Sequence, residues 1–293
     1  MTLEQLRIFV AVAQLEHVTQ AASRLNLTQA AVSASIATLE AQYGVKLFDR
    51  VGRNIVLTTA GRLFLTEARD VLARSAAAQA VLRDYAGLTH GHLSVAASQT
   101  LASYYLPAIV VAFQALHPNF RIDLRVGNTA QVVHDVTAGD VELGFIEGPL
   151  SAPTLHIAPI ATERMIVVVG PAHEWAAGHP LSDADLRSST WVFREPGSGS
   201  REAFLAALAQ RGIKEADLTI ALTLPSNEAV REAVVHGAGA ACLSPLVCER
   251  ALQAGALVQA NRQLPPRLFQ TVRHKDRYAA QATLAFLAMA QKT

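Results

Sequence analysis

The chain has 293 residues, of which 51% are hydrophobic and 17% charged, so it has the composition of a globular protein with two or three compact units and not of a disordered one. Its formal net charge of +1 by itself says little about nucleic-acid binding. No segment approaches the ~20 apolar residues of a membrane span, and the start of the chain lacks the pattern of a signal peptide. We therefore expect a cytoplasmic protein without a membrane partner.

The first predicted helix starts after Thr2, which with Gln5 forms a capping-box pattern. A second helical run starts at Thr19 and contains two adjacent alanines, Ala21 and Ala22, that allow another helix to approach closely. Asn26 and Leu27 end this run. The pattern is typical of the first half of a helix-turn-helix.

Thr28 is placed to cap the second helix of this motif, predicted over 29–42. Its expected buried stripe recurs at about 3.6-residue spacing and consists of Ala31, Val32, Ile36 and Leu39. Gln29, Ala30 and Ser33 fall near the solvent-facing side. A small, polar free face of this kind suits insertion into a DNA major groove ~12 Å wide.

A short basic hairpin follows, with one strand in 46–50, a turn at Gly52 and a second strand in 55–57. Arg50 and Arg53 lie where a phosphate backbone would pass a β-wing. The motif and the wing together predict binding to double-stranded DNA; the alternative is an αα-hairpin packed in an ordinary core. Residues 1–62 contain six basic and four acidic side chains. Because this bias is small, we expect an oligomer to supply further phosphate contacts.

Thr59 is predicted to cap a long helix over 60–86. About 27 residues of helix would be ~40 Å long, too long for burial in a small domain. Its apolar positions alternate spacings of four and three, as in a heptad seam: Phe64, Ala68, Val71, Ser75, Ala78, Leu82 and Tyr85. We expect an antiparallel copy of this helix to cover the seam in a homodimer; the alternative is packing along its own domain.

Two histidines and two cysteines could suggest metal or redox chemistry. His90 and His92 lack a third ligand at suitable spacing, and we interpret them as linker residues. Cys242 and Cys248 are expected to be small buried residues in a reducing compartment, with a redox pair as the alternative. We expect no metal and no cofactor.

From Leu93 onward, strand-like and helical segments alternate, which predicts parallel α/β sheets in two lobes. The chain would leave the first lobe near Pro159 and return through Pro265 and Pro266, so that the last strand and helix rejoin the first lobe. Strands are expected at 93–97, 121–126, 142–146, 165–170, 190–194, 219–223, 240–243 and 268–273. Helices are expected at 100–116, 130–138, 183–187, 199–212, 227–237, 245–253 and 277–291.

Three of these helices start with small hydroxyl or amide residues, in 98–100, 197–200 and 226–227. Free backbone N–H groups make helix starts favourable for anions, and in parallel α/β lobes they lie at the carboxyl ends of the strands, where ligands bind. We therefore expect a small anionic effector between the lobes. The alternative is that these residues only cap their helices.

The chain resembles the LysR-type transcriptional regulators over its whole length. The most specific matching residues are Phe9, Ala21, Ala22, Leu25, Thr28, Gln29, Ala31, Val32, Ser33, Ile36, Leu39, Glu40, Gly44, Leu57, Thr58, Ala60 and Gly61, with the stretch 47–50. The sequence departs from the family pattern at Ala30, commonly proline, and at Thr59, commonly glutamate or proline. Residues 194–201 resemble the branch of Calvin-cycle and sulfur-assimilation regulators.

This resemblance implies an N-terminal all-α winged helix-turn-helix, a long linker helix and a C-terminal α/β effector domain of two lobes, like the type 2 periplasmic binding proteins. The DNA-binding domain would cover 1–59, the linker and dimerisation helix 60–88, and the effector domain 89–293. Lobe I would comprise about 91–162 and 267–293, and lobe II about 163–266.

The resemblance also implies roles for individual residues. Gln29 and Ser33 would reach base edges or nearby phosphates, Thr19 and Thr28 would hold the DNA backbone beside Ala30, Arg50 would contact the backbone, and Arg53 would probe the minor groove. The expected effector residues are Ser98, Gln99, Thr100, Thr129, Glu147, Ser198, Ser200 and Asn227. Arg201 could add a contact, whereas Glu147 and Glu195 would repel an anion unless they face away.

The branch favours an inorganic sulfur oxyanion or a phosphorylated or carboxylated metabolite as the effector. We expect no catalysis, because 197–200 matches neither the G-x-S-x-G elbow nor a phosphate-transfer loop. Family members also suggest assembly of dimers into homotetramers, with RNA polymerase as a candidate partner. The alternative is a two-lobed small-molecule-binding protein or an enzyme with an accessory DNA-binding module.

Overall fold

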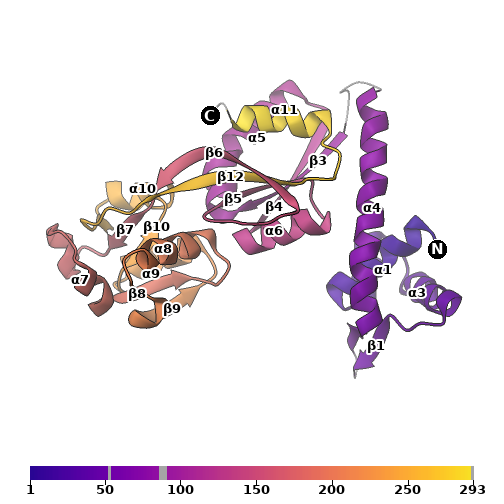
Figure 1. Ribbon diagram of the computed structural model, residues 1–293, viewed down its shortest axis with the longest axis horizontal. Coiled ribbons are helices and arrows are strands. Elements are labelled where there is room, and N and C mark those ends of the chain that lie inside the picture. Colours follow the sequence, from indigo (N-terminus) through magenta and orange to yellow (C-terminus); the bar gives the residue numbers. More distant parts are fainter. Residues whose placement is uncertain (52–53, 86–90, 292–293) are drawn as a thin grey trace. The chain divides into compact units, whose positions relative to one another are not determined.

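The computed structural model describes residues 1–51, 54–85 and 91–291. The chain forms two compact units, Met1–Tyr85 with Ala138–Asp140, and Ala86–Thr137 with Val141–Thr293 (Figure 1). Within the described residues, no helix is long and apolar enough to cross a membrane.

The first unit contains a helical bundle, a β-hairpin and a long helix. Its elements are α1 (Leu3–Leu15), α2 (Val18–Leu25), α3 (Gln29–Tyr43), β1 (Phe48–Val51), β2 (Asn54–Leu57) and α4 (Thr59–Tyr85). The expected capping box is present, because Thr2 Oγ1 accepts from the Gln5 N–H at 3.1 Å and Gln5 Oε1 accepts from the Thr2 N–H at 2.9 Å. The winged helix-turn-helix and the long helix after it are thus confirmed.

Phe9 of α1 lies at the centre of this unit. Its ring centroid is 5.4 Å from that of Phe48 in the hairpin and 4.9 Å from that of Phe64 in α4. Ala21 and Ala22 are buried on the other side of α1, where their small side chains let α2 pack closely. One aromatic residue therefore joins the bundle, the wing and the start of α4.

Three local expectations for this unit were wrong. α2 starts at Val18 and is capped by His17, whose Nδ1 accepts from the Gln20 N–H at 3.4 Å, so Thr19 lies inside the first turn. Thr58, not Thr59, caps α4, because its Oγ1 accepts from the Gly61 N–H at 2.9 Å. Ala31 is exposed.

The first lobe of the second unit is a mixed sheet in the order β4-β3-β5-β12-β6. Its strands are β3 (Gly91–Ser98), β4 (Phe120–Gly127), β5 (Leu143–Glu147), β6 (Leu155–Arg164) and β12 (Pro266–His274). One face is covered by the π-helical turn η1 (Leu101–Tyr105), α5 (Leu106–Leu116) and α11 (Gln281–Ala290), and the other by α6 (Thr129–Ala138) (Figure 1). The last strand and helix return to this lobe, as expected.

The second lobe is built around Trp191, whose ring centroid lies 5.8 Å from Trp175 and 4.9 Å from Phe204. Its strands are β7 (Ile166–Val169), β8 (Thr190–Arg194), β9 (Thr219–Leu224), β10 (Ala241–Leu243) and β11 (Val258–Gln259). Its helices are α7 (Asp183–Ser188), α8 (Gly199–Ala209), α9 (Asn227–Val235) and α10 (Pro245–Gln253), with short 3-10 turns η2 (Glu174–Ala177) and η3 (Glu215–Asp217).

Two long strands connect the lobes. β6 and β12 pair antiparallel from Pro266 opposite Arg164 to His274 opposite Leu155, with a bulge between Phe269 and Gln270. The expectation of purely parallel sheets was wrong here, because β12 also runs antiparallel to β5, and in the second lobe β7 is antiparallel to β10 and β11. β6 itself was not predicted as a strand.

Candidate functional site

The exposed end of the helix-turn-helix carries most of the residues predicted to contact DNA. Thr28 caps α3 as expected, since its Oγ1 accepts from the Ala31 N–H at 3.2 Å. Gln29, Ala30 and Ser33 are exposed in the first turns of α3, and Thr19 is exposed in the first turn of α2. The fold thus leaves these side chains free for a partner.

The wing is anchored to α3 by Glu40, a residue that the sequence had matched to the family without a role. Its Oε1 accepts from the backbone N–H of Leu47 at 2.8 Å and of Phe48 at 3.2 Å, and its Oε2 accepts from Lys46 Nζ at 2.7 Å. Burial raises the pKa of the Glu40 carboxyl, but the bonds from Lys46 and the two backbone N–H groups outweigh this and hold the pKa below its ordinary value.

This anchoring bears on Arg50, for which the alternative to a DNA contact is a surface ion pair with Asp49 or Glu40. The Glu40 carboxylate is occupied by Lys46 and the backbone, while Arg50 is exposed on β1. Arg53 lies outside the described residues.

In the second unit, the predicted effector residues gather around the carboxylate of Glu147. This side chain is 2% exposed and stands at the carboxyl end of β5. Its Oε2 accepts a hydrogen bond from the Ser98 hydroxyl, at the end of neighbouring β3, and its Oε1 accepts from Thr100 Oγ1 at 3.1 Å. Thr129, at the start of α6, donates to the Glu147 carbonyl at 3.1 Å. The carboxyl ends of adjacent strands therefore converge as predicted.

The second lobe reaches the same cluster through Asn227 and Arg194. Asn227 Nδ2 donates to Thr100 Oγ1 at 3.1 Å, and Arg194 Nη1 donates to Asn227 Oδ1 at 2.5 Å. Gln99 adds a bond across the lobes, since its Oε1 accepts from the Asn227 N–H at 2.9 Å. Hydrogen bonds therefore run unbroken from Glu147 in the first lobe to Arg194 in the second.

Arg267 completes the cluster. It lies on β12, which with β6 forms the connection between the lobes that we call the hinge. Its Nη1 donates to Ser200 Oγ at 3.1 Å and lies 3.8 Å from Glu147 Oε1. Its Nε and Nη2 donate to Glu163 Oε2 at 2.9 and 2.7 Å. We call the set Ser98, Thr100, Thr129, Glu147, Arg194, Ser200, Asn227 and Arg267 the Glu147 cluster.

Gly199 explains how α8 comes so near to Glu147. A Cβ at Gly199 would lie 2.1 Å from the Glu147 carbonyl oxygen and 2.5 Å from Thr129 Oγ1. No side chain fits in this space, so glycine at the first residue of α8 is what allows Ser198 and Ser200 to be buried beside the cluster.

The capping alternative holds for some of these residues and fails for others. Ser226 caps α9, since its Oγ accepts from the Ala229 N–H at 3.0 Å, whereas Ser198 makes no side-chain capping bond to α8. Thr100 gives no capping bond to η1 and bonds Glu147 instead.

Two further side chains that the sequence had left open are engaged elsewhere. Arg201 donates to the Arg194 carbonyl at 2.8 Å and to Glu215, so it braces the end of β8 and does not turn into the cluster. Glu195 accepts from Arg194 Nε at 2.8 Å and from Asn128 Nδ2 at 3.2 Å. Burial raises the pKa of the Glu195 carboxyl, but these bonds outweigh it and lower the pKa.

Metal ligands do not explain these clusters. Among residues 1–51, 54–85 and 91–291, no group of three or more His, Cys, Asp or Glu side chains could hold an ion. His92 contacts Asp123, with Nε2 and Oδ2 2.7 Å apart, and His90 lies outside the described residues.

Comparison with known families agrees with both halves of the structure. Residues 3–62 match the bacterial regulatory helix-turn-helix protein family, lysR family, and residues 86–293 match the LysR substrate binding domain. The chain belongs to the LysR family of transcriptional regulators.

Several LysR regulators are similar over nearly the whole chain. The HTH-type transcriptional regulator YeiE of Escherichia coli (strain K12) is 35% identical over 289 residues, covering 98% of this chain and 96% of that protein. CysL of Bacillus subtilis (strain 168) is 31% identical over 84% of this chain and 82% of its own length. The RuBisCO operon transcriptional regulator of Allochromatium vinosum is 32% identical over 88% of this chain and 84% of that protein. These relatives agree with the branch that residues 194–201 suggested.

Solved structures show the same LysR fold. Full-length CbnR complexed with its target DNA superposes with a TM-score of 0.67 at 24% identity, covering 100% of this chain and 99% of that one. The regulatory domain of Synechocystis PCC6803 CcmR in complex with 2-PG superposes with a TM-score of 0.63 at 21% identity, covering 69% of this chain and 97% of that domain.

Sequence reasoning missed the two buried arginines of this LysR effector domain. Arg194 and Arg267 are 4% and 5% exposed. Arg194 lies at the end of a predicted strand, just before a glycine-rich helix start, and this position could have identified it as a site residue. Arg267 follows Pro266 at the start of β12, and only the pairing of β12 with β6 brings it to Glu163 and Ser200.

Proposed function

We propose that this LysR regulator responds to a small anion that binds in the Glu147 cluster and competes there with the Glu147 carboxylate. The observation that carries the proposal is that the Ser98 and Thr100 hydroxyls, both predicted to bind an effector, donate to this carboxylate. The side chain of Glu147 thus occupies the place that an oxyanion would take.

The donors in the cluster suit an anion stripped of water. Two buried guanidinium groups and three hydroxyls, those of Ser98, Thr100 and Ser200, converge from both lobes. Charge-assisted hydrogen bonds to such groups contribute ~1.5–3 kcal/mol each. An anion that displaced Glu147 could therefore supply the ~5.5 kcal/mol needed to move a two-state equilibrium from 1:99 to 99:1.

We favour a sulfur oxyanion or a phosphorylated or carboxylated metabolite as the effector. CcmR, whose regulatory domain shares the fold, was solved with 2-PG, and the similar regulators include CysL and RuBisCO operon regulators. In this proposal the chain catalyses no reaction: binding of the anion changes how the lobes hold each other and thereby how the assembled protein presents its DNA-binding domains.

We assign DNA contacts to the exposed end of the helix-turn-helix and to the wing. Gln29 and Ser33 read base edges, Thr19, Thr28 and Ala30 lie along the DNA backbone, Arg50 neutralises a phosphate, and Arg53 enters the minor groove. Because its partner is genomic DNA, the protein acts in the cytoplasm, with RNA polymerase as a further partner.

The protein binds DNA as a homodimer that forms through α4. Leu82 and Tyr85 are 72% and 90% exposed, and Val71 is exposed on the same stripe. In an antiparallel pair centred near Ser75, the end of one α4 lies over the start of the other. There Leu39, Tyr43, Val45 and Phe64 help to line an apolar pocket of about 320 Å³ that can receive these side chains. Two such dimers associate into a tetramer through the effector domains.

Footprinting of the full-length protein on its own upstream region tests the DNA contacts. Arg50→Ala and Arg53→Ala should each weaken binding to all DNA sequences. Each should also reduce the slope of log K against log salt concentration by about one, which corresponds to one phosphate contact. Gln29→Ala should instead change which bases are preferred. Protein that protects no genomic fragment, or a Gln29→Ala variant with unchanged base preference, would contradict this assignment.

A further inference from the structure

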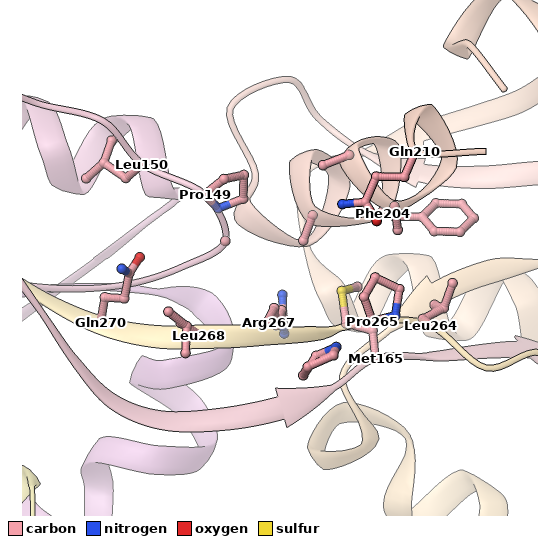
Figure 2. A pocket seen from close by; sticks show the side chains of 15 residues that line it. Pro149, Leu150, Met165, Phe204, Gln210, Leu264, Pro265, Arg267, Leu268 and Gln270 are labelled. Carbon is pink, nitrogen blue, oxygen red and sulfur yellow. The ribbon is translucent and has the colours of Figure 1, made fainter. Parts of the chain in front are cut away.

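A cavity lies beside the hinge formed by β6 and β12, separate from the hydroxyls of the Glu147 cluster. It measures about 370 Å³, within the range of small-molecule sites. Its walls come from the loop after β5, from α8 and from β12, with Pro149, Leu150, Phe204, Leu268 and Gln270 among the lining residues (Figure 2).

Most of this hinge cavity is apolar, with one unsatisfied polar atom. Gln270 Oε1 is buried and accepts no hydrogen bond from any residue that the structure describes. Figure 2 shows the Gln270 amide and the Leu268 side chain rising from β12 towards Leu150. A buried carbonyl oxygen without a donor is costly. Because Gln270 Oε1 has less than 1 Å² of accessible surface, its amide must turn into the cavity before the N–H or O–H group of a ligand can satisfy it.

The charges around the cavity exclude a second anion site. Among the described residues that line the cavity, Arg267 alone is charged, and its guanidinium already donates to Glu163 and Ser200. With the Glu147 carboxylate 3.8 Å from the same guanidinium, two carboxylates face one cation. An anion in the Glu147 cluster would displace one of these carboxylates, whereas an anion in the cavity would have to share the guanidinium with both of them. A neutral molecule therefore fits the cavity better.

Arg267 also connects the two sites. It belongs to the cavity wall and, through Ser200, to the Glu147 cluster. The cavity is lined by Met165, between the first lobe's β6 and the second lobe's β7, and by the start of β12, so both connections between the lobes contribute to it. An occupant would contact the segments that must bend when the lobes move.

We propose that the hinge cavity is a second ligand site, for a small neutral molecule with an apolar body and one hydrogen-bond donor directed at Gln270. Its occupant stiffens the hinge and modulates the response to the ligand of the Glu147 cluster. The site itself does not depend on which ligand that cluster takes.

The test uses the full-length protein and two fluorinated probes observed by ¹⁹F NMR. 4-Fluorobenzyl alcohol has the apolar body and the donor, whereas 4-fluorotoluene lacks the donor. We expect saturable binding of the alcohol, roughly tenfold tighter than that of the toluene, because only the alcohol satisfies Gln270. Equal affinities, or no saturable binding of either probe, would overturn the proposal.

Two variants locate the binding. Gln270→Leu keeps the size of the side chain. It should lower the affinity for the alcohol to that for the toluene and leave the affinity for the toluene unchanged. Ala206→Phe, at an exposed lining position of α8, should fill the cavity and abolish binding of both probes. Alcohol binding that survives Ala206→Phe in a variant with unchanged thermal unfolding would place the probe elsewhere and refute the site.

Discussion

The hydroxyl of Thr100 donates to the carboxylate of Glu147 across 3.1 Å, so a residue predicted to bind an effector is engaged by the chain's own anion. Ser98 does the same on the other carboxylate oxygen. A helix start and two strand ends thus surround a carboxylate of the chain itself, and in our proposal an external anion competes with it for these donors.

Removing the internal anion should therefore strengthen effector binding. In Glu147→Gln the negative charge is lost while the side chain keeps its size, and we expect the anion to bind about tenfold more tightly because a like charge a few ångströms away no longer opposes it. Calorimetry on the full-length variant measures this. Glu249→Gln is the control, since Glu249 is exposed on α10, contacts Gln253 and lies outside the Glu147 cluster. Weaker anion binding in Glu147→Gln than in wild type would refute the competition.

Glu40 should control the stability of the wing. Glu40→Ala leaves two backbone N–H groups without their acceptor. We therefore expect the free energy of unfolding of the first unit to fall by about 2 kcal/mol, and DNA binding to weaken. Glu40→Gln, which retains one acceptor oxygen, should lose less. Equal stability of Glu40→Ala and wild type in urea titrations would show that the anchor is unimportant.

The same carboxyl predicts a pH dependence. The pKa of Glu40 is lowered on folding, so its contribution is complete above the ordinary value of 4.5 and is lost as the pH falls below that value towards the folded pKa. The stability difference between wild type and Glu40→Gln should accordingly shrink on acidification through this range. A difference that stays constant down to pH 3 would contradict the assignment.

The exposed stripe of α4 should carry the dimer. Val71→Asp with Leu82→Asp places two charges in a contact that would be buried, and we expect dissociation to smaller species with loss of operator binding. Ala76→Asp, on a different side of the same helix, is the control. Light scattering measures the molar mass of each variant. An unchanged mass for the double variant would contradict dimerisation through this stripe of α4.

The cysteines should behave as core residues. Cys242 and Cys248 are buried, and burial raises the pKa of both thiols, that of Cys248 to about 12. A thiol reagent at pH 8 should therefore label them only on the timescale of unfolding. Rapid labelling of the folded protein, or a disulfide formed on mild peroxide treatment, would favour the redox alternative.

Residue patterns predicted the helix-turn-helix, the long helix and the alternation of strands and helices, because spacing and capping are local properties. They failed at β6, because Pro159 was interpreted as the point where the chain leaves the first lobe. β6 is an edge strand of its sheet, and an edge position tolerates a residue without an N–H. The seam was predicted in part: Ala68 is buried and Phe64 packs against the core of its own domain, which leaves the later positions for a partner.

At the candidate site, the sequence predicted which helix starts would meet but not what they would bind. Ser98, Thr100 and Thr129 lie where parallel strands of the first lobe end at one edge of its sheet. Ser200 and Asn227 follow β8 and β9, which are parallel and end together in the second lobe. Arg267 comes from a strand that runs the opposite way and about 70 residues later than α8 begins, so no local pattern could place it. The hydrogen bonds from Ser98 and Thr100 to the Glu147 carboxylate depend on side-chain positions that only the folded chain shows.

Calorimetric titration of the full-length protein with sulfite, sulfate and 2-PG tests whether an anion binds among the hydroxyls of the Glu147 cluster. We expect at least one of these anions to bind wild type, and we expect Thr100→Val combined with Ser200→Ala to weaken this binding at least about tenfold, since two donors are lost. An anion that bound the double variant as tightly as wild type would show that the effector site lies elsewhere and that these hydroxyls serve only the fold.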